Sequence, residues 1–238
     1  MLRQFKDILV SGSIALGLAF AFQTAAFATY HIPSESMVPT LEVGDRLTVN
    51  KFAYGYSRHS LPLDMSLPAT VKGRYLPAEP KRGDIIVFVH PKTTDRMIKR
   101  LIGLPGDRIA IDNGEVVLTG ERLPRKLERT SKFREFEGRV VEVNRYVERL
   151  PGGVSHPVLE YVQRRHHGSM PERVVPAGHY FMMGDNRDNS ADSRFPEMGM
   201  VPAENLVGRA DAVLYSFYSC EPEPGTHCAR RRFATKLE

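Results

Sequence analysis

The sequence is poor in cysteine and has no repeated or low-complexity segment, and both absences narrow its class. Two cysteines in 238 residues are too few for a disulfide-dense scaffold or a cysteine-rich zinc module. The 42% hydrophobic and 26% charged residues exclude a disordered polymer, a collagen-like repeat and a multi-pass membrane protein. A net charge of +5 is too dilute to indicate a nucleic acid as a partner. These limits leave a folded chain of one medium domain or two small ones.

One long uncharged run lies near the N-terminus, at residues 8–30. A helix of these 23 residues would span about 35 Å, enough to cross a hydrocarbon core of about 30 Å. Arg3 and Lys6 precede the run, and positive charge on this side favours a cytoplasmic N-terminus. We therefore predict a cytoplasmic segment over residues 1–7, a single-pass transmembrane helix over residues 8–30 and the rest of the chain outside the membrane.

A cleavable signal peptide is the alternative interpretation of this run. Ala26-Phe27-Ala28 has the small-x-small pattern of a cleavage site. Both interpretations place the remaining chain in an oxidising space. A disulfide between Cys220 and Cys228 is there a hypothesis that the sequence leaves open.

Short apolar runs separated by glycine and proline follow the N-terminal segment. This spacing is typical of a mainly β, antiparallel fold. Asn113-Gly114 between two such runs is a specific hairpin signal. The predicted strands lie at residues 46–49, 85–89, 97–102, 108–111, 115–118, 140–143, 180–183 and 212–215.

The composition changes in the middle of the chain. Residues 121–170 hold 11 Lys and Arg against 7 Asp and Glu, with few continuous apolar runs. We interpret this change as a β-rich inserted subdomain over residues 116–173, within a main domain over residues 31–115 and 174–216. The remainder, residues 217–238, is expected to be a C-terminal tail, and its last ten residues, 229–238, a solvated basic segment.

Two serines, Ser34 and Ser36, lie in a short segment between Pro33 and Pro39. Proline fixes φ and removes a backbone donor, so this segment is extended or turned and not helical. A rigid loop of this kind suits an exposed nucleophile. An ordinary linker leaving the membrane has the same composition and is the plainer alternative.

A lysine, Lys99, lies within the apolar run 97–102. As a strand, the run places Met97, Lys99 and Leu101 on one face, so the lysine is a candidate for burial. Burial disfavours the ammonium form and lowers the pKa of a lysine, and a neutral amine can take the proton of a serine hydroxyl. A surface lysine on a strand edge is the plainer alternative.

The densest polar stretch is residues 184–194, which predicts a tight, self-hydrogen-bonded loop. A calcium loop counted from Asp188 needs glycine sixth and glutamate twelfth, where the chain has Ser193 and Gly199. No cysteine or histidine stands at zinc-ligand spacing either. We therefore predict neither a metal nor a cofactor.

In this order, behind an apolar N-terminal segment, the three stretches resemble bacterial type I signal peptidases, membrane-bound serine proteases that remove signal peptides. The motifs that carry the resemblance are PSESMVPTL at residues 33–41, KRLIGLPGD at residues 99–107 and GDNRDNSADSR at residues 184–194. The resemblance covers residues 30–115 and 174–216. It implies a signal-peptidase-like antiparallel β fold and a Ser/Lys dyad without histidine.

The resemblance also implies a role for each matching side chain near the reaction. Ser36 is the acylating nucleophile, and Lys99 is its general base. Ser34 resembles the hydroxyl that assists the Ser36 N–H in the oxyanion hole, and Ser190 resembles the hydroxyl that orients the lysine amine.

Four further residues match positions that support such a site, namely Asp185, Asp192, Arg194 and Arg100. Glu35 departs from a common form of the pattern, which has glycine between the two serines. A side chain at this position must point away from substrate, or accept a backbone angle that glycine adopts more easily.

The substrates that the resemblance implies are secretory pre-proteins, cut after small residues at the −1 and −3 positions. Ser36 follows Tyr30 by six residues, at most about 20 Å of chain, which keeps the nucleophile close to the outer face of the plasma membrane. This position favours an uncleaved anchor in the lipid bilayer. Shallow apolar pockets would select small residues, and the walls that we expect are Ile32, Met37, Leu41, Ile86 and Ile98.

Two rival functions share parts of this pattern. A related Ser/Lys protease, either a conjugation-linked maturation peptidase or a self-cleaving repressor, would have the same dyad. A membrane-tethered β domain that binds peptides without cutting them would have an altered dyad, whereas Ser36 and Lys99 are both present.

Overall fold

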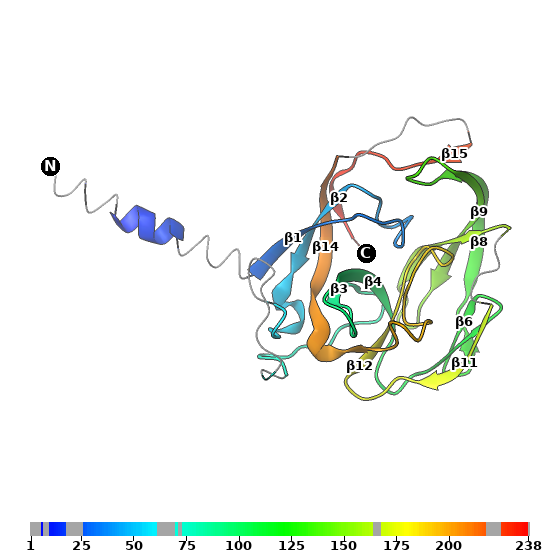
Figure 1. Cartoon of the computed structure of the whole chain (residues 1–238), viewed down its shortest axis with the longest axis horizontal. Coiled ribbons are helices and arrows are strands. Elements are labelled where there is room, and N and C mark those ends of the chain that lie inside the picture. The colour runs from blue at the N-terminus through cyan, green and yellow to red at the C-terminus, as the bar shows by residue number, and fades with distance from the viewer. Residues whose placement is uncertain are drawn as a thin grey trace.

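One helical segment, at residues 10–17, leads into a body of strands in the computed structural model (Figure 1). No helix in the described part of the chain is long and apolar enough to cross a membrane. Residues 8, 9 and 18–25 of the expected anchor lie outside the described residues. The structure describes residues 6, 10–17, 26–60, 70, 73–163, 168–217 and 225–237.

The end of the expected anchor is a strand and not a helix. Strand β1 (Phe27–His31) pairs along its whole length with β2 (Asp45–Asn50). This pairing satisfies backbone groups of β1, and its side chains alternate between exposed and half-buried. A helix that reaches residue 30, as we predicted, is therefore not observed, because residues 27–31 form this strand.

An eight-stranded sheet forms the larger part of the body. Its members besides β1 and β2 are β3 (Ile85–Val89), β4 (Arg96–Gly103), β12 (His179–Met183), β13 (Val201–Pro202), β14 (Leu206–Ser216) and β16 (Phe233–Lys236). The order is β1-β2-β14-β3-β4-β12-β13, with β16 paired to β14, and neighbouring strands are antiparallel. The prediction of a mainly antiparallel β fold is confirmed.

A second sheet of four strands lies within the predicted insert, apart from one short strand near the C-terminus. Its members are β8 (Arg125–Arg134), β9 (Val140–Arg149), β10 (Ser155–Tyr161) and β15 (Thr226–His227). The order is β10-β9-β8-β15, and only the pairing of β15 with β8 is parallel. Figure 1 shows β8 and β9 on the side of the body opposite to β1.

A third sheet joins the predicted insert to the main domain. Its members are β5 (Arg108–Asp112), β6 (Glu115–Leu118), β7 (Glu121–Arg122) and β11 (Ser169–Val174), in the order β11-β5-β6-β7. Asn113 and Gly114 form the turn between β5 and β6 with φ of 50° and 84°, so the predicted hairpin is confirmed. The expected start of the insert at residue 116 falls inside β6, because this sheet takes strands from both regions.

The C-terminal segment is more structured than the solvated tail that we expected, although every side chain of β16 is exposed. Arg232 forms an ion pair with Asp45 and donates a hydrogen bond to the Thr40 carbonyl at 3.0 Å. Cys228 is buried and disulfide-bonded, whereas Cys220 lies outside the described residues. Pairing of β15 with β8 and of β16 with β14 therefore holds this segment against both sheets.

Two short 3-10 helices connect strands of the main sheet, η1 (Lys51–Tyr54) after β2 and η3 (Ala203–Asn205) before β14.

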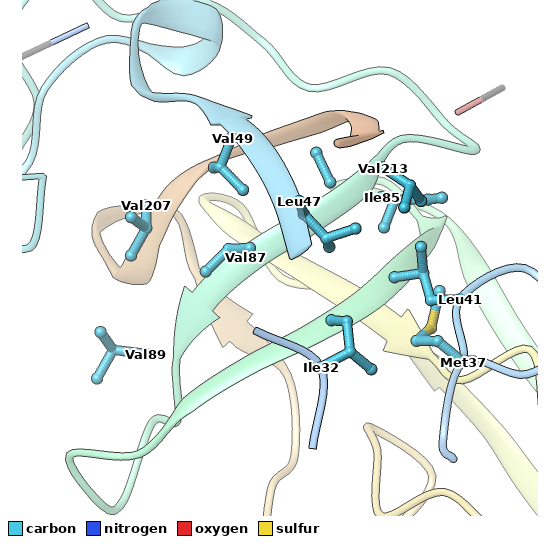
Figure 2. Packing of buried hydrophobic residues seen from close by; sticks show 11 residues of the cluster. Ile32, Met37, Leu41, Leu47, Val49, Ile85, Val87, Val89, Val207 and Val213 are labelled. Carbon is cyan, nitrogen blue, oxygen red and sulfur yellow. The ribbon is translucent and has the colours of Figure 1, made fainter. Parts of the chain in front are cut away.

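The loop between β1 and β2 is anchored in the core beneath the main sheet. Figure 2 shows Ile32, Met37 and Leu41 of this loop packed against Leu47 and other apolar side chains from β2, β3 and β14. Burying a side chain of this size contributes about 1.5–3 kcal/mol. Ile32 precedes Ser36 and Met37 follows it, and both are buried. The backbone of the loop is therefore fixed at the position of Ser36.

Candidate active site

Ser36 and Lys99 are 63 positions apart in the sequence, and the fold brings them together. Lys99 Nζ lies 2.7 Å from Ser36 Oγ. The same nitrogen donates to the Ile98 carbonyl at 2.9 Å. Both side chains are buried, with 8% of Ser36 and 3% of Lys99 exposed. This contact is the arrangement that a serine nucleophile and a lysine base require.

Short-range hydrogen bonds shape the loop that carries Ser36. The Val38 N–H donates to the Glu35 carbonyl, and the Leu41 N–H donates to the Met37 carbonyl. The Ser36 carbonyl accepts a hydrogen bond from the Asn186 N–H at 3.2 Å. The loop is therefore turned, as its prolines predicted, and is tied to the polar loop that follows β12.

Strand β4 brings Lys99 to the serine and removes it from water. Met97 and Leu101 pack in one apolar cluster, and Ile98 packs against another, as alternation along a strand predicts. Burial lowers the pKa of Lys99 to about 8, although the nearby Asp192 and Asp185 raise it. About a tenth of this amine is therefore uncharged at pH 7, far more than for a lysine with the ordinary pKa of 10.5.

The other two predicted hydroxyls lie on either side of this pair. Ser34 is exposed, and its Oγ lies 3.4 Å from Ser36 Oγ. Ser190 is buried beside Asp192, but its Oγ makes no hydrogen bond of acceptable geometry with any described residue. The hydrogen bonds of the Lys99 amine are thus with the Ser36 hydroxyl and the Ile98 carbonyl, and Ser190 does not share in them.

Arg100 and Asp185 form a buried pair behind the reacting groups. Two guanidinium nitrogens of Arg100 each donate to Asp185 at 2.9 Å, and a third donates to the Gly83 carbonyl. Thr40 also donates to Asp185. Burial alone would raise the pKa of Asp185, but the charge and hydrogen bonds of Arg100 hold it below its usual value.

Asp192 and Arg194 form a second pair within the same polar loop. Arg194 Nε lies 2.7 Å from Asp192 Oδ1, and the Gly184 N–H donates to the other carboxylate oxygen at 3.0 Å. Burial raises the pKa of Asp192, yet Arg194 and the Gly184 N–H together lower it below its usual value. The four supporting residues predicted from the sequence therefore form two paired clusters.

Residues that the sequence reasoning missed also shape this region. A Cβ on Gly184 would collide with the Ser36 carbonyl and with Ser190, so only glycine fits there. His156 is buried 3.5 Å from Glu148 and 3.9 Å from Asp185, and burial lowers its pKa to about 4, which keeps the ring neutral. The glycine in the 184–194 motif was a signal that could have identified Gly184. No local pattern in the sequence marks His156.

The five expected pocket walls differ in exposure. Ile32, Met37 and Leu41 are at most 2% exposed and belong to one hydrophobic cluster, against which Ile98 also packs. Ile86 is equally buried but belongs to another cluster. Of the five residues, Ile98 alone is partly exposed, and the pocket that they would form stays a prediction.

Among the described residues, no three histidine, cysteine, aspartate or glutamate side chains gather as a metal site. Both buried aspartates beside the dyad are already paired with arginine. The chemistry that these residues offer by themselves is proton transfer between an amine and a hydroxyl.

Comparison with known proteins shows which family the chain resembles. A family model described as "Signal peptidase, peptidase S26" matches residues 5–215. A signal peptidase I from Pseudomonas fluorescens is 40% identical over 207 residues, which cover 82% of this chain and 66% of that protein. A signal peptidase I from Rickettsia typhi is 33% identical over 218 residues, which cover 89% of this chain and 80% of that protein.

A solved structure also resembles the chain, the signal peptidase I of Enterococcus faecalis V583, at 25% identity over 56% of this chain and 97% of that one. Its TM-score of 0.33 is too low to add to the assignment. The chain spans 66% of the length of the Pseudomonas relatives. From the family model and the extent of these identities, we conclude that the chain belongs to the signal peptidase family, peptidase S26.

Proposed function

We propose that this chain is a membrane-anchored serine endopeptidase that removes signal peptides from secretory pre-proteins. The observation that carries the proposal is the 2.7 Å contact between the buried Lys99 amine and the Ser36 hydroxyl. Membership of the signal peptidase family supports the same reaction and substrate class.

The proposed reaction begins with proton transfer within this contact. The neutral Lys99 amine takes the Ser36 proton as Ser36 Oγ attacks the carbonyl carbon of the scissile peptide. The Lys99 ammonium then protonates the leaving amine, and the acyl group stays on Ser36. Lys99 next takes a proton from water, which attacks the ester and releases Ser36.

Two further groups have roles in this proposal. The Ser36 N–H and the Ser34 hydroxyl stabilise the oxyanion, since Ser34 lies 3.4 Å from Ser36 on the exposed side of the loop. The Ile98 carbonyl orients the Lys99 amine through its 2.9 Å hydrogen bond. In this proposal the Ile98 carbonyl, and not the Ser190 hydroxyl, orients the Lys99 amine.

The proposed specificity is for small residues at the −1 and −3 positions of the substrate. A partly exposed Ile98 beside the dyad suits a shallow apolar pocket that rejects large or charged side chains. We place the reaction at the outer face of the plasma membrane, with the N-terminus in the cytoplasm, because Ser36 follows the apolar run so closely.

The deciding experiment compares Ser36→Ala and Lys99→Ala with the unmodified protein on a secretory precursor in detergent. Each variant should lose about a thousandfold or more of the cleavage rate, because either change removes one half of the dyad. Ser155→Ala and Lys126→Ala, which alter exposed residues of the inserted sheet, are matched controls that should cleave normally. Retained cleavage by either dyad variant contradicts the mechanism.

The pH dependence of the unmodified protein gives a second test. Lys99 must be neutral to act, so kcat/KM should rise about tenfold per pH unit and level off above the Lys99 pKa of about 8. A rate that stays constant between pH 6 and 9 would show that no such amine takes part.

A further inference from the structure

Glu35 stands between the two serines and connects the loop to two other parts of the fold. Its Oε1 accepts a hydrogen bond from the Phe136 N–H at 2.7 Å, at the turn between β8 and β9. Its Oε2 accepts a hydrogen bond from Asn189 Nδ2 at 3.3 Å, in the polar loop after β12. One carboxylate therefore joins the neighbour of Ser36 to the inserted sheet and to the residues behind the dyad.

The turn that donates to Glu35 is itself well braced. The Glu135 N–H donates to the Arg139 carbonyl, and the Gly138 N–H donates to the Glu135 carbonyl, each at 2.8 Å. The Glu135 side chain pairs with Arg139 and accepts a hydrogen bond from the Tyr161 hydroxyl. The Phe136 N–H is therefore presented from a fixed position.

An apolar contact on the other side of Ser36 reaches the same sheet. Val38 is buried in a cluster with Phe133, Val143, Leu159 and Tyr161, all from β8, β9 and β10. The inserted sheet thus contacts the loop at two places: one hydrogen bond from Phe136 reaches the residue before Ser36, and apolar packing reaches the second residue after Ser36.

We propose that Glu35 is a positioning residue, which fastens the Ser36 loop to the inserted sheet so that this sheet sets the geometry of the acylating hydroxyl. The inference rests on the proposed function, since it gives the insert a part in that same reaction. The sequence has Glu35 where a common form of the motif has glycine. Glu35 is not among the described residues with positive φ, so this position does not need the backbone angle that glycine adopts more easily. Its side chain instead points toward the inserted sheet.

The charges around Glu35 make this attachment sensitive to acid. Burial raises the pKa of Glu35, the Phe136 N–H lowers it, and Glu135, Glu137 and Glu42 raise it again, for a net increase. A protonated carboxyl can no longer accept from both donors, so one attachment is lost. The other charged and titratable groups at this junction are Arg134, Arg139 held by Glu135, Tyr161 and His227 held by Glu42.

The test compares Glu35→Ala, Glu35→Gln and Asn189→Ala on a secretory precursor, with Glu137→Gln as the matched control. Glu137 is an exposed glutamate two residues beyond Glu135 in the same turn. We expect Glu35→Ala to lower kcat about tenfold with KM nearly unchanged, because a misplaced nucleophile slows acylation more than binding. Glu35→Gln keeps an acceptor for Phe136 and should restore most of the rate.

A pH profile separates positioning from a merely structural role. In both proteins, log kcat/KM should fall with a slope of about one below the Lys99 pKa, because Lys99 must lose its proton to act. Glutamine imitates a protonated Glu35, so the rate advantage of the unmodified protein over Glu35→Gln should shrink to nothing as Glu35 takes up a proton in acid. An advantage that stays constant over the whole pH range would contradict the acid sensitivity of this attachment. The Tm of each variant is measured at the same pH values.

The outcomes are distinct. If Ser36→Ala is inactive but Glu35→Ala cleaves as fast as Glu137→Gln, this inference is wrong and the proposed function stands. If Glu35→Ala lowers Tm without changing kcat at a temperature where it is folded, the role is structural and the inference is again wrong. If Ser36→Ala still cleaves, the proposed function fails and this inference fails with it.

Discussion

Strands of the main sheet and of the inserted sheet differ in how deeply they bury charged side chains. On β4 of the main sheet, Lys99 and Arg100 are adjacent and have 3% and 0% exposed surface. On β8 of the inserted sheet, most side chains are exposed, and most of the charged ones face water. A buried charge costs desolvation free energy unless it is paired or neutral, whereas an exposed one costs little.

This difference separates the part of the molecule that does chemistry from the part that supports it. The main sheet keeps an unpaired amine buried, and the lowered Lys99 pKa is the direct result. Its neighbours Arg100 and Asp185 neutralise each other. The inserted sheet buries few of its charges, and it contacts the Ser36 loop mainly through Val38 and Glu35. Variants in the two sheets should therefore affect stability by very different amounts.

The largest stability effect is expected for Arg100→Leu. The change leaves Asp185 buried without its guanidinium partner, and breaking a buried pair in this way costs about 3–5 kcal/mol. Protonation of Asp185 relieves this cost, so the loss should shrink as the pH falls toward the acid range. Urea unfolding at several pH values measures it. A loss under about 1 kcal/mol at neutral pH would contradict the comparison between the sheets.

An intermediate effect of the opposite sign is expected for Lys99→Met. Since burial lowers the Lys99 pKa from 10.5 to about 8, the folded state carries a cost of about 3 kcal/mol wherever the amine is charged. The inactive variant should be more stable than the unmodified protein by about this amount below pH 8. The gain should fade as the pH rises toward 10.5, where the unfolded lysine is also neutral. Equal stability at pH 6 would show that Lys99 is well solvated.

The smallest effect is expected for Glu128→Gln. Glu128 on β8 and Arg145 on β9 lie 2.6 Å apart in the inserted sheet, and their side chains are 46% and 27% exposed. Exposed pairs of this kind contribute about 0–1 kcal/mol, so the free energy of unfolding should hardly change. The same urea measurement serves as a control for Arg100→Leu. A loss as large as that of Arg100→Leu would remove the distinction between the two sheets.

The sequence predicted best where side-chain alternation and turn chemistry act locally. Alternation around Lys99 made this lysine a candidate for burial, which the structure confirms, and Asn113-Gly114 was enough to predict the hairpin. The positions of Ser36, Lys99, Asp185 and Arg100 in one region followed only from the family resemblance, since no local rule joins β4 to the loop after β12.

The predictions that failed concern contacts between distant segments. The burial of Met37 and Leu41 could not be predicted, because the sequence does not indicate which side of the Ser36 loop faces the core. Strand β8 was missed because its exposed charges hide the alternation of a half-buried strand. The C-terminal segment has a basic composition typical of a tail, and only its partners, such as Asp45 for Arg232, give it structure.

Those partners connect the two ends of the chain. Arg232 donates to the Thr40 carbonyl and pairs with the Asp45 carboxylate, so a residue near the end of the chain helps to hold a loop near its beginning. A truncation that removes Arg232 would therefore take two contacts from the loop that carries Ser36, although the cut lies far from that loop in the sequence.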